Sequence, residues 1–520
     1  MPPTTSLAAS LLRDTLVDTI NILDFNRIVA AKFLIDIDCY WTPGTFIKRA
    51  TPFDRLKEVA GDKPTWKPED LAVDAIFSQM FKLPGPERKM VYYHSLITET
   101  CKIAPAAIAP SLGRAIRYLY RNLNVMDIEL TYKFLDWFAQ HLSNFDFRWK
   151  WTEWVNDVDR TPLNPRKAFI LGALDKEVRL SFAKRIRETL PEPYHPLIPA
   201  SKDNDIPEFK YNSETTPHSA EARQILSLLK KKAAESDIQP IIDVINTSVA
   251  SSGSTNPLLA STDAYVTSLC YIGSKSLSHV LSYTERCKDR LLSLPAVART
   301  QIISSVVDYW QLVQPGVAVN IVDKLLNYTI LTPASVVEWA LGPEKLNGGR
   351  GLAETWVFEM VSRTVGKVTG RVRQIVAARS QVGLSLGQVE VLDETLAREV
   401  EGMRGLFATI DDALADVTEG SNEVMLEDDD GDDEGEGSEK ELQLLKMWGV
   451  KWRRVFRRKA AVEESLVGEA TKSFPPAGEE AEEKAVAMTT NGAAEGMKGQ
   501  GANVSVERKE ELLVDLDEVA

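Results

Sequence analysis

Residues 68–83 read PEDLAVDAIFSQMFKL, and this stretch decides the fold class. Pro68 suits the first turn of a helix, and the LPGP sequence at 83–86 stops one. The apolar side chains recur at steps of three and four, which is the period of one helix face. They are Val73, Ile76, Phe77, Met80 and Phe81. The stretch therefore predicts an amphipathic helix.

The same period recurs up to about residue 380, in segments of roughly 14–18 residues joined by short connections rich in Pro, Gly or Asn. Apolar runs of period two, bounded by hairpin signals, are scarce. Helices of this length with tight connections pack as antiparallel neighbours. We therefore predict an all-α, HEAT/armadillo-like α-solenoid of stacked antiparallel helix pairs. The predicted helices include 86–101, 110–123, 127–142, 164–190, 222–235, 264–294, 296–313 and 317–331.

The second half ends in a different pattern. From Val389 to Leu414 the apolar residues again follow steps of three and four, which predicts one arm of a coiled-coil-like hairpin. Residues 427–439, EDDDGDDEGEGSE, are mostly acidic and predict a disordered acidic loop. A further helix is expected at 441–460. The predicted organisation is a helical domain at 1–195, a proline-rich linker at 196–218, a second helical domain at 219–460 with an acidic loop at 416–440, and a disordered tail at 461–520.

Composition restricts the function. The 520 residues carry a formal net charge of −14, and so acidic a chain is a poor general binder of polyanions. The four cysteines form no CxxC pair and are expected to be buried free thiols in a reducing compartment. The first residues do not resemble a signal peptide, and no apolar stretch approaches the length of a membrane span. We therefore expect an intracellular protein that does not contact membranes.

Motifs for catalysis are not found. The sequence lacks GxxxxGK[ST], GxGxxG, HExxH and GxSxG, and its five histidines show no metal-ligand spacing. We expect no catalytic residue, no metal and no cofactor, and hence no enzyme.

Residues 144–154, NFDFRWKWTEW, allow two interpretations. Aromatic rings interleaved with Arg148 and Lys150 could stack on the bases of RNA. The same rings could pack into a helix–helix corner, with both cationic groups in water. The position of the segment directly after a predicted helix favours the corner, and leaves Arg148 and Lys150 as candidate partner- or RNA-facing residues.

The basic run KWRRVFRRK at 451–459 also allows two interpretations. It could be a nuclear-localisation or RNA-binding patch. It could instead belong to a helix whose apolar side is core and whose cations face water or the acidic loop. The spacing of Trp448, Trp452 and Val455 favours the second. The candidate partner- or RNA-facing residues here are Lys451, Arg453, Arg454, Arg457 and Arg458.

Four stretches in register resemble the large subunit of the nuclear cap-binding complex, particularly its fungal members. One is NFDFRWKWTEW after the DWFAQHLSN helix. The others are RLSFAKRIRETLP at 179–191, YIGSKSLSHVLSYTERCKDRL at 271–291 and VAVNIVDKLLNYTILTPASVVEWAL at 317–341. The resemblance covers about residues 10 to 460.

The resemblance implies helical domains similar to the middle domain of translation initiation factor 4G. It implies a non-catalytic scaffold that holds a small subunit with an RNA-recognition-motif fold. That partner stacks the 7-methylguanosine cap of RNA polymerase II transcripts, so this chain would contact capped RNA indirectly. It further implies a nuclear location, with possible cytoplasmic shuttling, and recruitment of splicing, export and decay factors. Residues 1–195 and 219–460 correspond to the family's second and third domains.

The chain departs from the family at both ends. The first helical domain and the import signal of the family are expected to have no counterpart in this sequence. The third domain is expected to be incomplete after Lys459, which would expose the apolar side of its remaining helices. Two alternatives stay open: a helical-repeat protein that binds RNA directly, and an adaptor scaffold for translation or decay.

Overall fold

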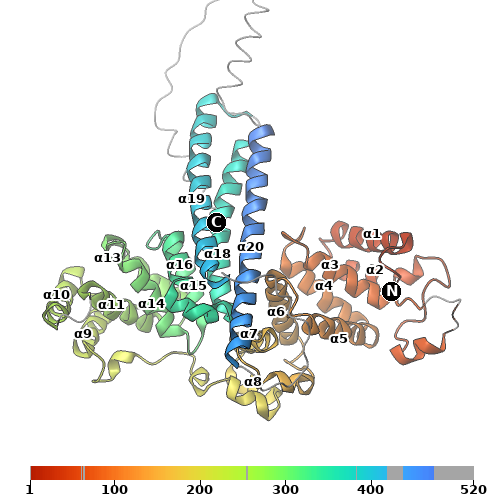
Figure 1. Ribbon diagram of the computed structural model, residues 1–520, viewed down its shortest axis with the longest axis horizontal. Helices are drawn as coiled ribbons and strands as arrows, with labels where there is room; N and C mark the ends of the chain where they lie inside the picture. Colours follow the sequence, from red (N-terminus) through yellow and green to blue (C-terminus); the bar gives the residue numbers. More distant parts are fainter. Residues whose placement is uncertain are drawn as a thin grey trace, which may run out of the picture.

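The structure is a computed structural model that describes residues 2–59, 61, 65–252, 256–381, 383–418 and 437–473. Throughout these ranges the chain forms α-helices and short 3-10 turns, and no strand. The helices pack side by side in two groups, with an upright bundle between them (Figure 1). The predicted all-α solenoid class is confirmed.

The first half of the chain is the group at the right of Figure 1. Its core includes several large side chains that are almost fully buried, among them Tyr93, Phe134 and Trp137. Its elements are α1 (Leu7–Ile22), α2 (Arg27–Ile35), η1 (Ile37–Cys39), η2 (Phe53–Glu58), α3 (Pro68–Met80), α4 (Met90–Ile103), α5 (Pro105–Arg121), α6 (Ile128–Ser143), η3 (Trp151–Asp157), α7 (Pro165–Leu180) and α8 (Ala183–Thr189).

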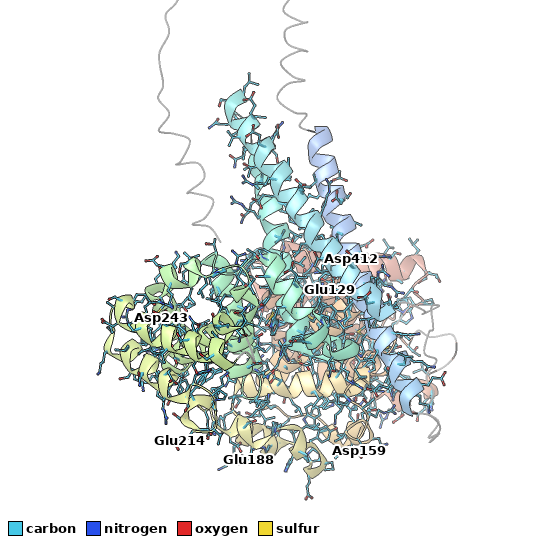
Figure 2. The ribbon with its side chains drawn as sticks, turned by 60° about the vertical axis from the view of Figure 1, so that its left-hand side comes forward. Glu129, Asp159, Glu188, Glu214, Asp243 and Asp412 are labelled. Carbon is cyan, nitrogen blue, oxygen red and sulfur yellow. The ribbon has the colours of Figure 1, made fainter. Side chains whose placement is uncertain are left out.

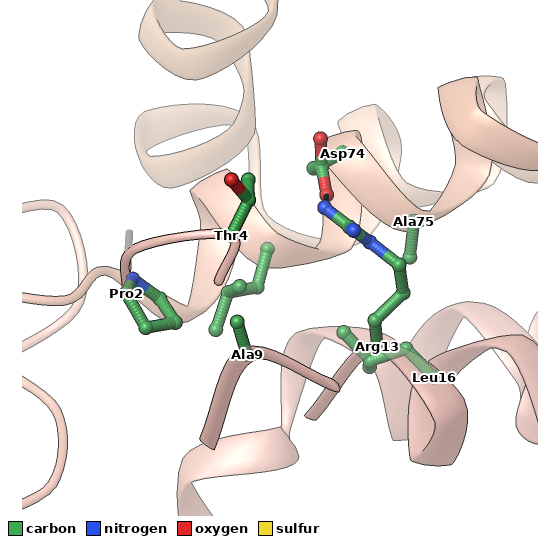
Figure 3. A pocket seen from close by; sticks show the side chains of 8 residues that line it. Pro2, Thr4, Ala9, Arg13, Leu16, Asp74 and Ala75 are labelled. Atoms are coloured by element: carbon green, nitrogen blue, oxygen red, sulfur yellow. Dashed lines mark hydrogen bonds and ion pairs between the residues drawn. The ribbon is translucent and has the colours of Figure 1, made fainter. Parts of the chain in front are cut away.

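Helix α3 is the helix predicted from residues 68–83. Val73, Ile76, Phe77 and Met80 are buried, as their spacing requires. On its other side, Asp74 forms an ion pair with Arg13 of α1, with 2.9 Å between Nη2 and Oδ2. Figure 3 shows this pair at the edge of a hollow of about 20 Å³, which is room for little more than one water. The hollow is therefore a packing feature and no ligand site.

The second half forms a separate hydrophobic core, at the left of Figure 1. Three buried residues of the first half, Ile128, Leu163 and Ala168, belong to this second core. After α8, η4 (Glu192–Leu197) still packs into the first core through Tyr194. The elements that follow are η5 (Ala200–Asp203), η6 (Lys210–Asn212), α9 (Ser219–Lys231), α10 (Glu235–Ser252), α11 (Pro257–Gly273), α12 (Leu277–Arg286), α13 (Lys288–Ser293), α14 (Ala298–Trp310), α15 (Pro315–Asn327), α16 (Pro333–Ala340), α17 (Pro343–Leu346) and η7 (Asn347–Ala353).

Three long helices form the bundle: α18 (Thr355–Arg379), α19 (Leu386–Thr418) and α20 (Gly437–Ser473). The predicted hairpin of α18 and α19 is present, and α20 packs along α19 as a third helix. Ion pairs show that α20 runs antiparallel to α19, because Arg404 meets Glu464 while Asp411 meets Arg453. The part of the acidic loop at 419–436 lies outside the described residues.

The segment at 196–218, expected as a linker, is packed against both halves. Phe209 and Tyr211 are buried in the second core. The hydroxyl of Tyr309 donates to the carbonyl of Pro207 at 3.1 Å. On the other side, the guanidinium of Arg187 donates to the carbonyl of Ile198 at 3.0 Å. The segment thus fixes the two halves rather than separating them.

Several predicted boundaries are wrong. The predicted helix 264–294 is three helices, because Gly273 lies against the backbone of Val280 and Ser276 caps α12. The predicted helix 164–190 breaks at Phe182, whose backbone is extended.

The tail does not begin at residue 461, since α20 continues to Ser473. This extension buries Glu463 and Val467 against the bundle. Residues 474–520 lie outside the described part of the chain. In the described part of the bundle α20 covers the apolar sides of α18 and α19, and the large apolar side chains left exposed there are Leu386 and Leu442. Large exposed apolar side chains are instead concentrated before residue 54. Cys39 is exposed, contrary to expectation, whereas Cys101, Cys270 and Cys287 are buried; all four are free thiols.

Candidate partner-binding and RNA-binding surfaces

The aromatic segment 144–154 turns the chain from α6 into η3. Asp146 and Phe147 have positive φ, and the amide of Phe147 donates to the carbonyl of Leu142 at 2.8 Å. This tight turn directs the following tryptophans back toward α6. Trp151 and Trp154 are only 1% and 4% exposed.

The ring of Trp154 stacks on Tyr120 of α5, with 3.8 Å between centroids and 4° between planes. The hydroxyl of Tyr120 donates to Asp157 at 2.7 Å, and burial raises the pKa of Tyr120. The hydroxyl of Tyr194 donates to the carbonyl of Trp151 at 2.7 Å. The packed corner is therefore confirmed, and base stacking by Trp151 or Trp154 is excluded because neither ring reaches the surface.

The cationic residues of this segment do lie at the surface. Arg148 is exposed. Lys150 is also exposed, and its ammonium pairs with Glu153 at 3.2 Å. Glu153 also binds Arg117, whose guanidinium lies 5.2 Å from the ring of the half-buried Trp149. Arg148 and Lys150 stay predictions as partner-facing residues.

The basic run lies on α20, and its apolar side is core as predicted. Trp448, Trp452, Val455 and Phe456 are buried. The indole of Trp452 donates to the carbonyl of Leu352 at 3.0 Å. The indole of Trp448 donates to the carbonyl of Leu163 in the first half, at 2.7 Å. The helix thus binds a residue of the first half of the chain within the second core.

Two cations of the run bind within the bundle. Arg453 and Arg457 both donate to Asp411 of α19, and each uses Nε and Nη2, at distances of 2.7 to 3.0 Å. These hydrogen bonds hold the pKa of Asp411 far below its ordinary value of 3.8. The pairs tie α20 to α19 along the lower part of the bundle.

Three further cations of the run bind the first half, and one of them is Lys459, whose ammonium pairs with Glu129 at 3.2 Å. Arg458 pairs with Asp127 at 2.6 Å and with Glu129 at 2.8 Å, at the start of α6. Lys451 donates to the carbonyl of Leu123 at 3.0 Å, and burial lowers its pKa to about 8. Glu129 lies close to the bundle in Figure 2. The acidic partners are therefore Asp411, Asp127 and Glu129, whereas the sequence pointed to water or the acidic loop.

Arg454 is the exposed cation of this run that remains a candidate for external contact. Lys451, Arg453, Arg457 and Arg458 have intramolecular partners instead. As partner- or RNA-facing residues, all five stay predictions. Sequence reasoning missed Asp127, Glu129 and Asp411; the one local signal was Asp127, which caps α6 by accepting from the amide of Glu129.

The junction between the halves continues along α18. The rings of Tyr132 and Phe358 stack with 4.2 Å between centroids. Arg179 of α7 pairs with Glu359 at 3.6 Å. Beside these contacts lies a groove of about 720 Å³ between α4, α6, α7 and α18, lined by side chains from both halves.

The described residues give little support for a metal-dependent or acid–base catalytic function. No group of His, Cys, Asp or Glu there could hold a metal ion. His141 is half-buried against Trp137, and burial lowers its pKa to about 4. His94 lines the groove, and burial lowers its pKa as well. Both imidazoles are therefore neutral packing groups at physiological pH.

Two family models with the description MIF4G like match residues 2–192 and 209–465, which together make up most of the chain. The chain belongs to the MIF4G-like family. Within it, the resemblance to nuclear cap-binding large subunits of the fungal type is confirmed. The two matches fall on the two helical groups described above.

Three relatives with similar sequences are all named as subunit 1 of the nuclear cap-binding complex or protein. The chain is 33% identical over 386 residues to nuclear cap-binding protein subunit 1 of Schizosaccharomyces pombe, covering 74% of this chain and 48% of that protein. It is 29% identical over 405 residues to the corresponding Eremothecium gossypii subunit (70% and 46%). It is 29% identical over 313 residues to the human subunit 1 (58% and 38%).

The chain thus spans about half the length of its fungal relatives, or less for the human one. The helical MIF4G-like domains and the relatives point to a binding scaffold rather than an enzyme. No helix in the described ranges has the length and apolarity to cross a membrane.

Proposed function

We propose that this chain is the non-catalytic scaffold subunit of a nuclear cap-binding complex. The observation that carries the proposal is the tandem of two MIF4G-like segments in a chain whose relatives are named nuclear cap-binding subunit 1. The structure supports a scaffold role, because α20 and α18 bind the first half through Arg458, Trp448 and Phe358. One stiff surface is thereby available to a partner.

The proposed partner is a small subunit with an RNA-recognition-motif fold, which itself stacks the 7-methylguanosine cap. A stiff helical surface can hold this partner in its cap-binding conformation before cap binds. The conformational entropy that the partner would lose on binding cap then no longer weakens cap binding. By linkage, the ordered partner binds cap more tightly. Capped RNA is then held through the partner, in keeping with the acidic charge of this chain.

The proposal extends to location and downstream partners. The names of the relatives favour the nucleus. In this role the complex recruits splicing, export and decay factors to the transcript, with shuttling to the cytoplasm. An adaptor in translation or decay would instead be excluded from the nucleus, so fluorescence imaging of the tagged full chain separates the two.

The test is reconstitution with the small subunit. The full chain is expected to co-purify with the partner and to raise its affinity for a 7-methylguanosine analogue at least about tenfold, equivalent to about 1.4 kcal/mol. A partner that binds cap equally well with and without the chain would contradict the scaffold role.

A second titration addresses direct RNA binding. The chain alone is expected to bind an uncapped oligonucleotide weakly, because its formal net charge is −14 and three arginines of its basic run already pair with carboxylates of the chain itself. Tight binding that weakens steeply with salt would favour the direct RNA-binding alternative. In that case the substitutions Arg148→Ala and Arg454→Ala would make the affinity for the oligonucleotide less dependent on salt concentration.

A further inference from the structure

The groove between the two halves has an apolar floor and an exposed apolar rim. The stacked rings of Tyr132 and Phe358 lie among its lining residues. At its edge, Val91 is 68% exposed and Leu180 is 41% exposed. Large apolar side chains at a concave surface are typical of sites that another segment covers.

The charged lining of the groove is net positive in an otherwise acidic chain. Lys133, Lys176, Arg179 and Arg363 line it, against Asp136 and Glu359. Lys176 pairs with Asp136, while Arg179 and Arg363 share Glu359. Lys133 donates to the carbonyl of Lys82 at 3.1 Å and has no carboxylate ion pair with any described residue. The groove therefore suits an acidic occupant with apolar side chains.

Polar atoms of the lining are also unsatisfied. Tyr132 Oη and His94 Nε2 are buried, and neither has a hydrogen-bond partner in the part of the chain that the structure describes. A buried polar atom without a partner costs about 1–3 kcal/mol.

Residues 510–519 of this chain, EELLVDLDEV, have the required composition. This segment lies outside the described residues, and its sequence contains five acidic side chains, five apolar ones and no cation. On a helix, Leu512, Leu516 and Val519 would share one face, with the acidic side chains around it. Such a pattern is typical of segments that lay an apolar face into a groove.

The segment can reach the groove. Glu463 of α20 pairs with Arg373 of α18, so the two helices are level there. From Glu463 to Ser473 the chain rises about 15 Å, and from Arg373 back to Arg363 at the groove it falls about 15 Å. The separation is therefore about 30 Å. A random-coil chain as long as the connection at 474–509 spans a root-mean-square end-to-end distance of about 33 Å.

We propose that the groove between α4, α6, α7 and α18 binds the acidic amphipathic segment 510–519 of the same chain. Leu512 and Leu516 would lie against the apolar floor, and the acidic side chains would face Lys133, Lys176 and Arg363. The segment would then act as an intramolecular ligand that bridges the two halves. This proposal does not depend on the cap-binding role.

Photo-crosslinking of the full chain tests the proposal. Benzoylphenylalanine is placed at Leu512, and crosslinked peptides are identified by mass spectrometry in a mixture of heavy- and light-isotope chains. The expected crosslinks join Leu512 to peptides that contain Val91 or Leu180, within one chain. Crosslinks between heavy and light chains would show a second copy as the occupant and overturn the proposal, as would crosslinks elsewhere or none.

A matched pair of substitutions shows whether the groove itself is responsible. Val91→Glu places a carboxylate at the exposed rim and is expected to reduce the crosslink about tenfold, through lost apolar burial and charge repulsion. Val297→Glu changes a valine that is 60% exposed and far along the chain, and should leave the crosslink intact. Equal effects of both substitutions would overturn the proposal. The double substitution Asp515→Lys and Asp517→Lys, which leaves the folded body unaltered, should reduce the crosslink as well.

Discussion

At the scale of single residues, the most unusual group is the carboxyl of Glu177 in α7. Its side chain is 0% exposed, and within the described chain neither oxygen has a hydrogen-bond partner. Burial raises the pKa of this carboxyl well above its ordinary value of 4.5. Glu177 is therefore protonated in the folded protein at pH values where the unfolded chain would ionise it.

The consequence is a dependence of stability on pH. Because the unfolded state releases the proton first, the free energy of unfolding falls as pH rises above 4.5, by at most about 1.4 kcal/mol per pH unit. Glu177→Gln removes the titration, so its stability relative to the wild type should grow with pH until the raised pKa is passed. Urea unfolding at a series of pH values measures this difference.

The control for Glu177 is Glu188→Gln. Glu188 is exposed on α8 and lies at the lower edge of the molecule in Figure 2. Its substitution should change the free energy of unfolding little at any pH. Parallel pH profiles for the wild type and Glu177→Gln would contradict the buried, protonated state of Glu177.

Apolar packing residues could be predicted from the sequence, while their polar partners could not. Trp448, Trp452 and Val455 are three or four positions apart, so they lie on one face of any helix that contains them. Their packing side can therefore be predicted from the local sequence. The carboxylates that bind the same helix are 42 residues away for Arg453 and 331 for Arg458. No local pattern selects such partners, because tertiary packing brings them together.

At the scale of elements, the presence of a helix could be predicted from the period of its apolar residues. The points at which a helix is interrupted could not, because they depend on close contacts with other elements. The apolar period runs through residues 264–294 without interruption. The chain can turn there because Gly273 has no Cβ; a Cβ at this position would lie only 2.6 Å from the Cα of Val280. Ser276 then caps α12 by accepting from the amide of His279. A glycine next to serines marks such a turn only once the neighbouring helix is known.

The pairing of α19 with α20 gives a prediction at this scale. Asp411→Asn weakens four charge-assisted hydrogen bonds from Arg453 and Arg457, and should lower the stability by about 1 kcal/mol, a modest value because the site is partly solvated. The pKa of Asp411 is depressed, so this stabilisation is present above the ordinary value of 3.8 and is lost as pH falls below it. Thermal unfolding at neutral and acidic pH measures both effects.

Asp412→Asn is the matched control, since Asp412 is the exposed neighbour on the same helix. It should leave the melting temperature nearly unchanged. An equal loss from Asp411→Asn and Asp412→Asn would show that general charge, rather than the arginine pairs, stabilises the bundle.

At the scale of the whole molecule, one helix near the end of the described chain fixes the first half. Arg458 binds Asp127 and Glu129 across this junction. Arg458→Ala leaves both carboxylates without this partner and should cost about 2 kcal/mol. Hydrogen exchange should become faster at the start of α6, while Arg454→Ala, an exposed arginine on the same helix, should have no such effect. Unchanged exchange in α6 would contradict the role of Arg458 as a joint between the halves.

A tight contact between α7 and α18 provides a test of how the two halves are arranged. A Cβ on Gly172 of α7 would lie 2.4 Å from Cγ2 of Thr355 in α18 and 2.7 Å from Cδ1 of Leu135. Gly172→Ala should therefore destabilise the chain by about 1–3 kcal/mol, although alanine favours a helix. Thr355→Ser removes the clashing methyl group and should recover part of this loss in the double variant. Unfolding of the two single variants and the double variant gives a coupling free energy, which should be favourable if the halves pack as one body. Simple additivity of the two substitutions would mean that α7 and α18 do not press against each other in solution.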